Sequence, residues 1–163
     1  MRTTKKNMIE SQLKPEGITC LDTISCISRV NREDFVPKKY TDSSYAEFDI
    51  PLDNNYFMLR PITVAKILQL LEIKKSDEIL EIGTGTGYLT CCLSILGKSV
   101  DTLDIDNDIQ AKAKSSLNNY NLYNISFINE DVFSNWIPKK QYDVIVLTGS
   151  TDSRVEKLED SLN

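Results

Sequence analysis

A glycine-rich run and two acidic residues carry the clearest chemical signal in this sequence. The run Glu81-Ile82-Gly83-Thr84-Gly85-Thr86-Gly87-Tyr88 directly follows a short apolar segment. Glycines at this spacing let the backbone turn sharply and approach a ligand closely. Asp104 follows about 20 residues after the first glycine, where a carboxylate can accept hydrogen bonds from both hydroxyls of a ribose. Asp131 can accept one from an adenine amino group, so the set predicts a nucleoside-binding site.

The spacing of the glycines indicates which nucleoside binds. A dinucleotide-binding turn has the form Gly-x-Gly-x-x-Gly, which requires glycine or alanine where this chain has Tyr88. The lysine and serine of a nucleotide-triphosphatase loop do not follow the glycines either. The form Glu-x-Gly-x-Gly-x-Gly resembles the first motif of class I methyltransferases. That resemblance implies S-adenosylmethionine as the cofactor, with Glu81 near its methionine part.

The residue types that the chain lacks narrow the chemistry further. It contains no histidine, which excludes Ser-His-Asp and Cys-His catalysis and every metal centre with histidine ligands. The cysteines show no Cys-x-x-Cys spacing, so we expect small buried side chains and no metal site at Cys20, Cys26, Cys91 and Cys92.

Length and composition fit one ordinary globular domain, since 163 residues are 40% hydrophobic and 26% charged. The net charge of -5 argues against a nucleic-acid partner, because neutralising phosphates takes clustered lysine and arginine. No apolar stretch is long enough to cross a bilayer, and the first residues do not lead into a signal-peptide core. We therefore expect a cytoplasmic protein without a nucleic-acid or membrane partner.

The elements that position the glycine run and the two acids are predicted from residue 78 onward. Short apolar runs alternate there with helical segments, near Tyr88 to Leu96 and Ile109 to Leu117, which is typical of parallel βαβ units. Because ligands bind at the carboxyl ends of such strands, we expect the glycine run, Asp104 and Asp131 to face one crevice. The predicted strands are Glu78 to Ile82, Val100 to Leu103, Ile125 to Ile128 and Tyr142 to Leu147.

Residues 1–60 are predicted to form a helical and loop region, and residues 61–163 a partial Rossmann-like domain. Thr19 and Asp22 resemble a capping box that would start the second helix of the first region. Residues 43–59 are rich in turn residues, and Pro61 suits the first turn of a further helix. The first region either covers a sheet edge or contacts substrate. Apolar residues recur there at helical spacing at Met8, Ile9 and Leu13 and at Leu21, Ile24, Ile27 and Val30.

Several segments resemble the protein-L-isoaspartate O-methyltransferase family. They are Met8 to Leu13, Arg29 to Pro37, Tyr45-Ala46, Leu80 to Tyr88 and Tyr142 to Gly149. The resemblance implies an α/β, Rossmann-like class I methyltransferase fold: a parallel sheet of about four strands, helices on both faces and an N-terminal helical extension. It also implies methyl transfer from S-adenosylmethionine to the carboxylate of L-isoaspartyl residues in damaged proteins, which is a protein-repair reaction. The expected cofactor site comprises Glu81, Gly83, Thr84, Gly85, Gly87, Asp104 and Asp131.

The loop before Pro61 departs from the family pattern. The family carries a Thr-Ile-Ser-Gln-Pro type sequence there, whereas this chain has Leu59 in place of the hydroxyl residue. Arg60 either pairs with a substrate carboxylate or is a solvated charge near a helix start. We expect Leu59 and Arg60 to act in the substrate loop, and residues 54–60 and 148–150 to border an isoaspartyl peptide or protein. Such a carboxylate is already ionised, so alignment and exclusion of water suffice for catalysis.

The C-terminal part of the sequence leaves alternatives open. Family members carry further strands after the fourth, so we expect Val155 to Asn163 to lead toward strands that are missing here. The fourth strand would then expose an edge suited to self-association. One alternative is an S-adenosylmethionine-binding domain without isoaspartyl methyltransferase activity, and another is an unrelated binding module on the same fold. Methylation of a base or amide nitrogen would need Asn/Asp-Pro-Pro-Tyr after the fourth strand, where this chain has Thr148-Gly149-Ser150-Thr151.

Overall fold

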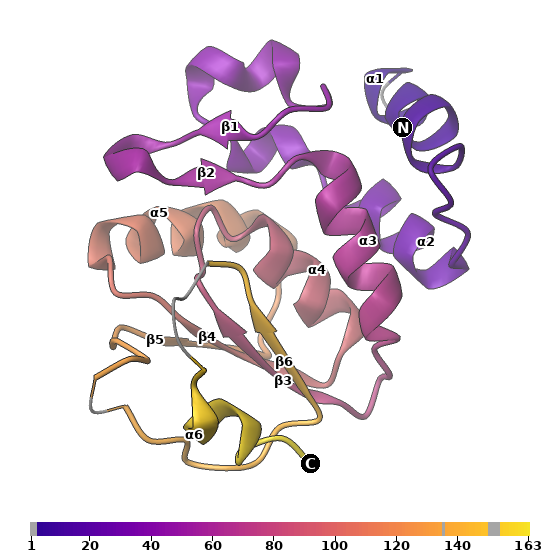
Figure 1. Ribbon diagram of the computed structural model, residues 1–163. Coiled ribbons are helices and arrows are strands. Elements are labelled where there is room, and N and C mark those ends of the chain that lie inside the picture. Colours follow the sequence, from indigo (N-terminus) through magenta and orange to yellow (C-terminus); the bar gives the residue numbers. More distant parts are fainter. Residues whose placement is uncertain (1–2, 135, 150–153) are drawn as a thin grey trace. The chain divides into compact units, whose positions relative to one another are not determined.

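The computed structural model describes residues 3–134, 136–149 and 154–163, and the chain divides into two compact units. The first unit is Met1–Glu72 and the second is Ile73–Asn163; Figure 1 labels the elements of each. The helix α3 (Pro61–Leu71) belongs to the first unit. The boundary between functional domains, expected at residue 60, stays a prediction.

The second unit is built on a parallel sheet. In the described part of the chain this sheet has four strands in the order β5-β4-β3-β6, and every neighbouring pair is parallel. The strands are β3 (Glu78–Ile82), β4 (Ser99–Leu103), β5 (Ile125–Ile128) and β6 (Val144–Leu147). Successive strands add on one side of β3 until β6 returns to its other side, so the order reverses at β3. Open α/β sheets bind ligands at this kind of reversal, and the glycine run follows β3.

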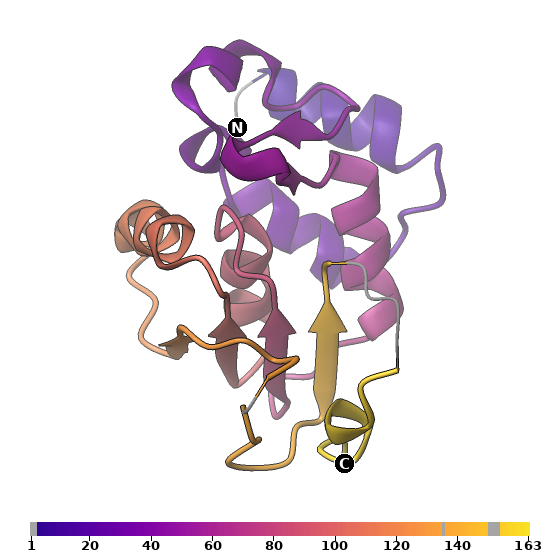
Figure 2. The same ribbon diagram turned by 60° about the vertical axis from the view of Figure 1, so that its left-hand side comes forward.

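Helices cover both faces of this sheet, as predicted (Figures 1 and 2). Side chains alternate between the faces along β3. Glu81 accepts a hydrogen bond from Thr90 of α4 (Tyr88–Leu96), so it faces that helix. Leu80 and Ile82 belong instead to a core cluster with Leu158 of α6 (Glu156–Glu159). The α/β fold class expected from the sequence is therefore confirmed.

Two helices of this unit pack beside the glycine run. Helix α4 is apolar around most of its circumference and is buried along nearly its whole length. Helix α5 (Asn107–Leu117) starts earlier than the predicted Ile109, because the Asp106 side chain caps it by accepting hydrogen bonds from the N–H groups of Asp108 and Ile109.

The first unit consists of helices and one short strand pair. The helices are α1 (Thr3–Met8), the π-helical segment η1 (Ile9–Leu13), α2 (Leu21–Arg29) and α3. Three 3₁₀ turns follow α2: η2 (Arg32–Phe35), η3 (Lys38–Ser43) and η4 (Asp53–Asn55). The segment expected to be a loop also contains an antiparallel pair, β1 (Ile50–Pro51) and β2 (Phe57–Met58).

The capping box predicted at Thr19 is wrong. Helix α2 begins at Leu21 with Cys20 as its N-cap, and no side-chain hydrogen bond caps it. The backbone N–H groups of Thr19 and Cys20 donate instead to the side-chain oxygen of Gln69 on α3, at 2.8 and 2.9 Å. A side chain distant in sequence therefore satisfies donors that the local pattern assigned to a cap.

Strand β6 lies at an edge of the described sheet. Tyr142, predicted to start this strand, instead forms an isolated parallel bridge with Leu162. Its N–H donates to the carbonyl of Ser161 and its carbonyl accepts from the N–H of Asn163, both at 2.8 Å. These last residues therefore line the start of β6, and self-association along the rest of its edge stays a prediction. Among the described residues, none of the helices has the length and apolar character that crossing a membrane requires.

Candidate functional site

The glycine run forms the turn between β3 and α4. Gly83 has a φ of +97°, and a Cβ built on it would lie 2.4 Å from Oγ1 of Thr148 after β6. Only glycine fits there, because both the backbone angle and the neighbouring side chain exclude a larger residue. Gly87 allows a close approach of another kind, since a Cβ on it would lie 3.0 Å from Cβ of Ala113 on α5. The turn is therefore packed against both of its flanks.

Gly85 differs from its neighbours because space lies in front of it. Its φ is +51°, and a Cβ built on it would meet no atom within 4 Å. This open space is on the ligand-binding side of the sheet, at the end where the strands terminate. A nucleoside can thus approach the backbone at Gly85.

Asp104 lies directly after β4 and is joined to the glycine turn. Its Oδ2 accepts a hydrogen bond from the N–H of Gly85 at 3.1 Å, and its Oδ1 accepts one from the N–H of Asp106 at 3.0 Å. A carboxylate offers about four acceptor positions, so this side chain keeps capacity for ribose hydroxyls. The structure thus brings Asp104 and the glycine run together.

Asp131 lies in the turn that follows β5, the strand beside β4. Its side chain is exposed and accepts a hydrogen bond from the N–H of Phe133 at 2.8 Å. The ends of the two strands are tied together, because Asn129 Nδ2 donates to the backbone carbonyl of Asp104 at 2.8 Å. Asp131 and Asp104 therefore follow the carboxyl ends of adjacent strands. Ile105 next to Asp104 is 63% exposed, an apolar surface suited to the face of a base.

Glu81 is fully buried at the end of β3. Its Oε2 accepts hydrogen bonds from Oγ1 of Thr90 at 2.6 Å and of Thr102 at 2.7 Å. Burial raises the pKa of its carboxyl group to about 7, against the lowering effect of the two threonine hydrogen bonds; the nearby charge of Asp104 adds to the rise. Its Oε1 is buried and has no hydrogen-bond partner among the described residues.

Thr84 anchors the glycine turn to β4. Its side chain is 3% exposed and contacts Thr102 Oγ1 at 2.8 Å, away from the open space. The N–H groups of Gly83 and Thr84 both donate to the carbonyl of Leu103, at 2.8 and 3.2 Å. The turn is therefore anchored to β4 by backbone hydrogen bonds as well as by Asp104.

These features fit a nucleoside that carries a charged amino-acid tail. The space at Gly85 admits the ligand and Asp104 supplies acceptors for ribose hydroxyls. A buried oxygen without a donor, such as Oε1 of Glu81, costs free energy until a donor reaches it. S-adenosylmethionine carries an ammonium group that could serve as that donor.

The predicted substrate loop lies in the first unit. Arg60 is the N-cap residue of α3, and both its N–H and its guanidinium bond to the carboxylate of Asp49, at 2.8 and 3.3 Å. The carbonyl of Leu59 accepts a hydrogen bond of 2.5 Å from the fully buried guanidinium of Arg32, which also donates to the carbonyl of Ser44 at 2.8 Å. The loop is thus fixed from inside its own unit. Of the predicted border 148–150, Ser150 lies outside the described residues.

Comparison with known proteins assigns the family. The model of the protein-L-isoaspartate(D-aspartate) O-methyltransferase family matches residues 3–163. The chain belongs to this family. A protein-L-isoaspartate O-methyltransferase of Aliivibrio salmonicida is 31% identical over 153 residues, which are 94% of this chain and 74% of that relative. Membership confirms the predicted methyltransferase class and S-adenosylmethionine as its cofactor, and it does not favour the alternative of a binding domain without activity.

Solved structures of protein-L-isoaspartate O-methyltransferases share the fold. One has a TM-score of 0.83 at 23% identity, and the alignment covers 98% of this chain and 52% of that one. A second, from Plasmodium falciparum in complex with S-adenosyl-L-homocysteine, has a TM-score of 0.83 at 18% identity and covers 100% of this chain and 81% of that one. Both confirm the Rossmann-like class I fold.

The sequence did not predict that Thr90 and Thr102 donate hydrogen bonds to Glu81, or that Thr148 fills the space beside Gly83. Thr102 is the register partner of Glu81 on β4, which only the strand pairing reveals. A usable signal was present, because a glutamate inside a buried strand needs hydrogen-bond donors nearby. Thr148 was expected to border the substrate, and its contact with Gly83 was not predicted. Its hydroxyl lies 3.1 Å from the carbonyl oxygens of both Ile82 and Gly83 and can donate its one proton to either of them.

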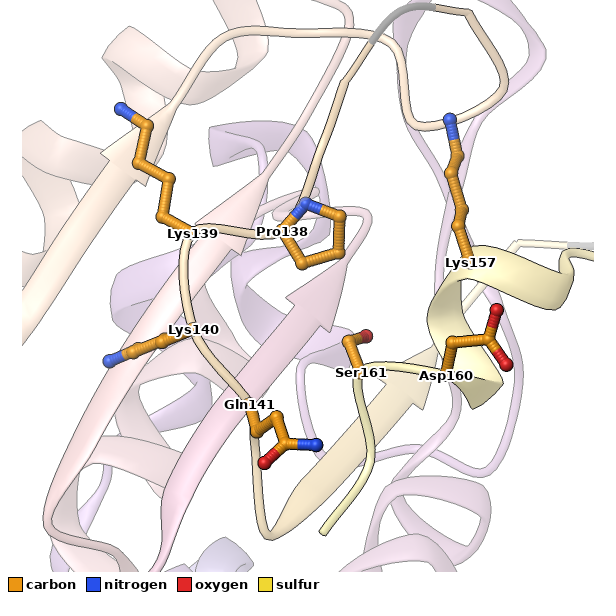
Figure 3. Close-up of a pocket in the computed structure, with 7 residues that line it drawn as sticks. All are labelled: Pro138, Lys139, Lys140, Gln141, Lys157, Asp160 and Ser161. Atoms are coloured by element: carbon orange, nitrogen blue, oxygen red, sulfur yellow. The ribbon is translucent and has the colours of Figure 1, made fainter.

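A basic hollow lies elsewhere in the second unit. It has a volume of about 370 Å³ and is lined by Pro138, Lys139, Lys140, Gln141, Lys157, Asp160 and Ser161 (Figure 3). Two of its cations already have protein partners. Lys157 Nζ donates to the carbonyls of Ser134 and Trp136 at 3.1 Å, and Lys140 pairs with Glu78 at 2.8 Å. These lysines hold the fold together, so we do not assign the hollow to the reaction.

Proposed function

We propose that this protein transfers a methyl group from S-adenosylmethionine to the free carboxylate of L-isoaspartyl residues in damaged proteins. The observation that carries the proposal is the hydrogen bond between Gly85 and Asp104 at the carboxyl end of the sheet. It occurs in a chain that its family's model matches over residues 3–163.

Each cofactor residue has a distinct role in this proposal. The ribose hydroxyls bind the acceptor positions that Asp104 keeps beyond its two backbone hydrogen bonds. The base packs against Ile105, and Asp131 accepts from its amino group. Gly85 lets the ligand approach the backbone, and Gly83 allows the close contact with Thr148. Gly87 allows α4 and α5 to pack, and the backbone N–H of Thr84 anchors the turn to β4. Glu81 accepts a hydrogen bond from the methionine part.

The chemistry needs few ionisable side chains. S-adenosylmethionine supplies an electrophilic methyl carbon on a positively charged sulfur. A carboxylate oxygen of the substrate forms a bond to that carbon while the carbon–sulfur bond breaks and its electron pair returns to sulfur. The products are a methyl ester and S-adenosylhomocysteine. The substrate is already ionised at neutral pH, so the protein only has to align the two groups and exclude water, which agrees with the absence of histidine.

In this proposal the substrate loop binds the substrate carboxylate through the side chain of Arg60. Leu59 has no polar side chain, and its carbonyl is taken by Arg32. The side chain of Arg60 is 48% exposed and forms an ion pair with Asp49, so it can exchange that partner for a substrate carboxylate. In the second unit, Thr148 and Gly149 border the substrate in this proposal. The substrates are isoaspartyl-containing proteins or peptides, and the expected location is the cytoplasm.

The test is methyl transfer to a pair of peptides that differ only in an isoaspartyl or an aspartyl linkage. With radiolabelled S-adenosylmethionine, we expect methyl incorporation into the isoaspartyl peptide and none above background into the aspartyl peptide. Base treatment should release the label as methanol, because the product is an ester. Equal labelling of both peptides, or of neither, would contradict the proposal.

A further inference from the structure

Five polar side chains are buried together beneath the glycine turn. They come from five different segments: β3, the turn itself, α4, β4 and α5. Each is at most 3% exposed: Glu81, Thr84, Thr90, Thr102 and Gln110. Burying polar groups costs free energy unless they are hydrogen-bonded. A cluster of this size is therefore either a fully bonded structural network or one prepared for a ligand.

The hydrogen bonds of this cluster run in one direction. Gln110 Nε2 donates to the backbone carbonyl of Ile128 at 3.0 Å, which fixes the orientation of its amide, and it lies 3.5 Å from Thr84 Oγ1. Thr102 has a single hydroxyl proton. Because that proton points to Glu81 Oε2 at 2.7 Å, Thr102 accepts from Thr84 across their 2.8 Å contact. The series of hydrogen bonds from Gln110 through Thr84 and Thr102 therefore donates in the direction of Glu81.

The two carboxylate oxygens of Glu81 differ in their hydrogen bonds. Oε2 receives two hydroxyl donors, because Thr90 adds a hydrogen bond of 2.6 Å to that of Thr102. Oε1 is buried and has no partner among the described residues. A network that served only the fold would be expected to satisfy both oxygens. The asymmetry indicates that Oε1 is held for a donor from outside the protein.

We propose that Thr90 and Thr102 are positioning residues for the cofactor: they fix Oε2 of Glu81, so that Oε1 stays directed at the ammonium group of S-adenosylmethionine. This inference rests on the proposed function. It assigns a binding role to two threonines that contact the cofactor only through Glu81. Thr84 and Gln110 set the direction of the chain from its other end.

Electrostatics agree with this geometry. Burial and the charge of Asp104 oppose ionisation of Glu81, whereas the two threonine donors favour it. From α4 and α5 the cluster receives the neutral groups of Thr90 and Gln110. Removing one hydroxyl therefore raises the pKa of Glu81 further, and binding that needs an ionised Glu81 then requires a higher pH.

The experiment measures binding, so it does not depend on turnover. Calorimetric titration of S-adenosylhomocysteine, which carries the same ammonium group, is run between pH 6 and pH 9 on wild type, Thr102→Val and Thr102→Ser. We expect Thr102→Val to bind about tenfold more weakly at pH 7.5, as for the loss of a hydrogen bond to a charged group. The pH below which its affinity falls should also move upward. Thr102→Ser should restore both values toward those of wild type.

Two further variants complete the design. Thr23→Val removes a hydroxyl that is 1% exposed in the first unit and should leave both values unchanged. Thr90→Val should reproduce Thr102→Val and carries the same test if that variant does not fold. A folded valine variant with the affinity and pH profile of wild type would overturn the inference alone. Wild type that neither binds the ligand nor methylates the isoaspartyl peptide would instead overturn the proposed function.

Discussion

The N–H of Gly85 donates a hydrogen bond of 3.1 Å to Oδ2 of Asp104, between the segments that follow β3 and β4. This contact joins the middle glycine of the turn to the residue expected to hold a ribose. Both therefore keep their relative position before any ligand arrives. Preorganisation of this kind lowers the entropy cost of binding.

Gly85→Ala tests the open space in front of the turn. A Cβ at this position meets no protein atom within 4 Å, so its folding cost is limited to strain from a φ of +51°, about 1 kcal/mol. We expect a folded protein whose binding of S-adenosylhomocysteine is weakened at least tenfold, because the methyl group enters the ligand's space. Gly17→Ala is the matched control, since Gly17 also has a positive φ and an open Cβ position but lies in the first unit. Equal binding by both variants would place the ligand elsewhere.

Gly83→Ala should act on stability, unlike Gly85→Ala. Its Cβ would lie 2.4 Å from Oγ1 of Thr148, and its φ of +97° adds backbone strain. Urea unfolding should show a loss of about 2 to 3 kcal/mol. Combination with Thr148→Ser, which keeps the clashing hydroxyl, should recover little. Wild-type stability of Gly83→Ala would contradict the close approach of the two residues.

Glu81→Gln should change the pH dependence of stability in the ligand-free protein. The pKa of Glu81 is about 7 when folded and about 4.5 when unfolded, so its contribution is fully present below pH 4.5 and lost as pH rises through 7. Glutamine cannot ionise and escapes this loss. Relative to wild type, the variant should therefore gain up to about 3 kcal/mol in stability between pH 4.5 and pH 8.

Urea unfolding of both proteins at pH 5 and pH 8 measures this difference. The background is favourable because the chain has no histidine to titrate in that range. A stability difference between variant and wild type that stays constant from pH 5 to pH 8 would show that Glu81 does not titrate there.

Asp49→Ala tests how the substrate loop is attached to α3. The Asp49 carboxylate accepts the N–H of Arg60 at 2.8 Å at the start of that helix, a capping role worth about 1 kcal/mol. We expect that loss in stability and a raised KM for the isoaspartyl peptide, because the loop is released. Asp42→Ala removes an exposed carboxylate of the same unit and should change neither value. An unchanged KM in Asp49→Ala would show that the cap of α3 does not affect substrate binding by this loop.

The parts of this structure that local patterns encode were predictable. Short apolar runs bounded by turn residues gave β3 and β5 with their bounds, and the glycine spacing gave the turn. Tyr142 was predicted to start the fourth strand. Its backbone bonds to Ser161 and Asn163 instead, partners that no local pattern reveals.

Contacts between distant residues were not predictable in the same way. Thr102 interrupts an apolar run, and only its register with Glu81 shows that its hydroxyl faces a carboxylate. Arg60 was predicted either to pair with a substrate carboxylate or to be a solvated charge. In the structure its guanidinium pairs with Asp49 of the preceding loop. The capping box predicted at Thr19 does not form, because the N–H groups of Thr19 and Cys20 donate to Gln69 on another helix. In each case, pairing across the fold decided the outcome.

The most direct test of the account is the affinity of S-adenosylhomocysteine for wild type and Asp104→Ala, measured by calorimetric titration at pH 7.5. Asp160→Ala, which removes an exposed acid near the basic hollow, controls for the change in net charge. The account predicts micromolar or tighter binding by wild type and Asp160→Ala, and binding ten- to a hundredfold weaker by Asp104→Ala, as for lost charge-assisted hydrogen bonds. Equal affinity in all three proteins would contradict the assignment of the cofactor site to the glycine turn and Asp104.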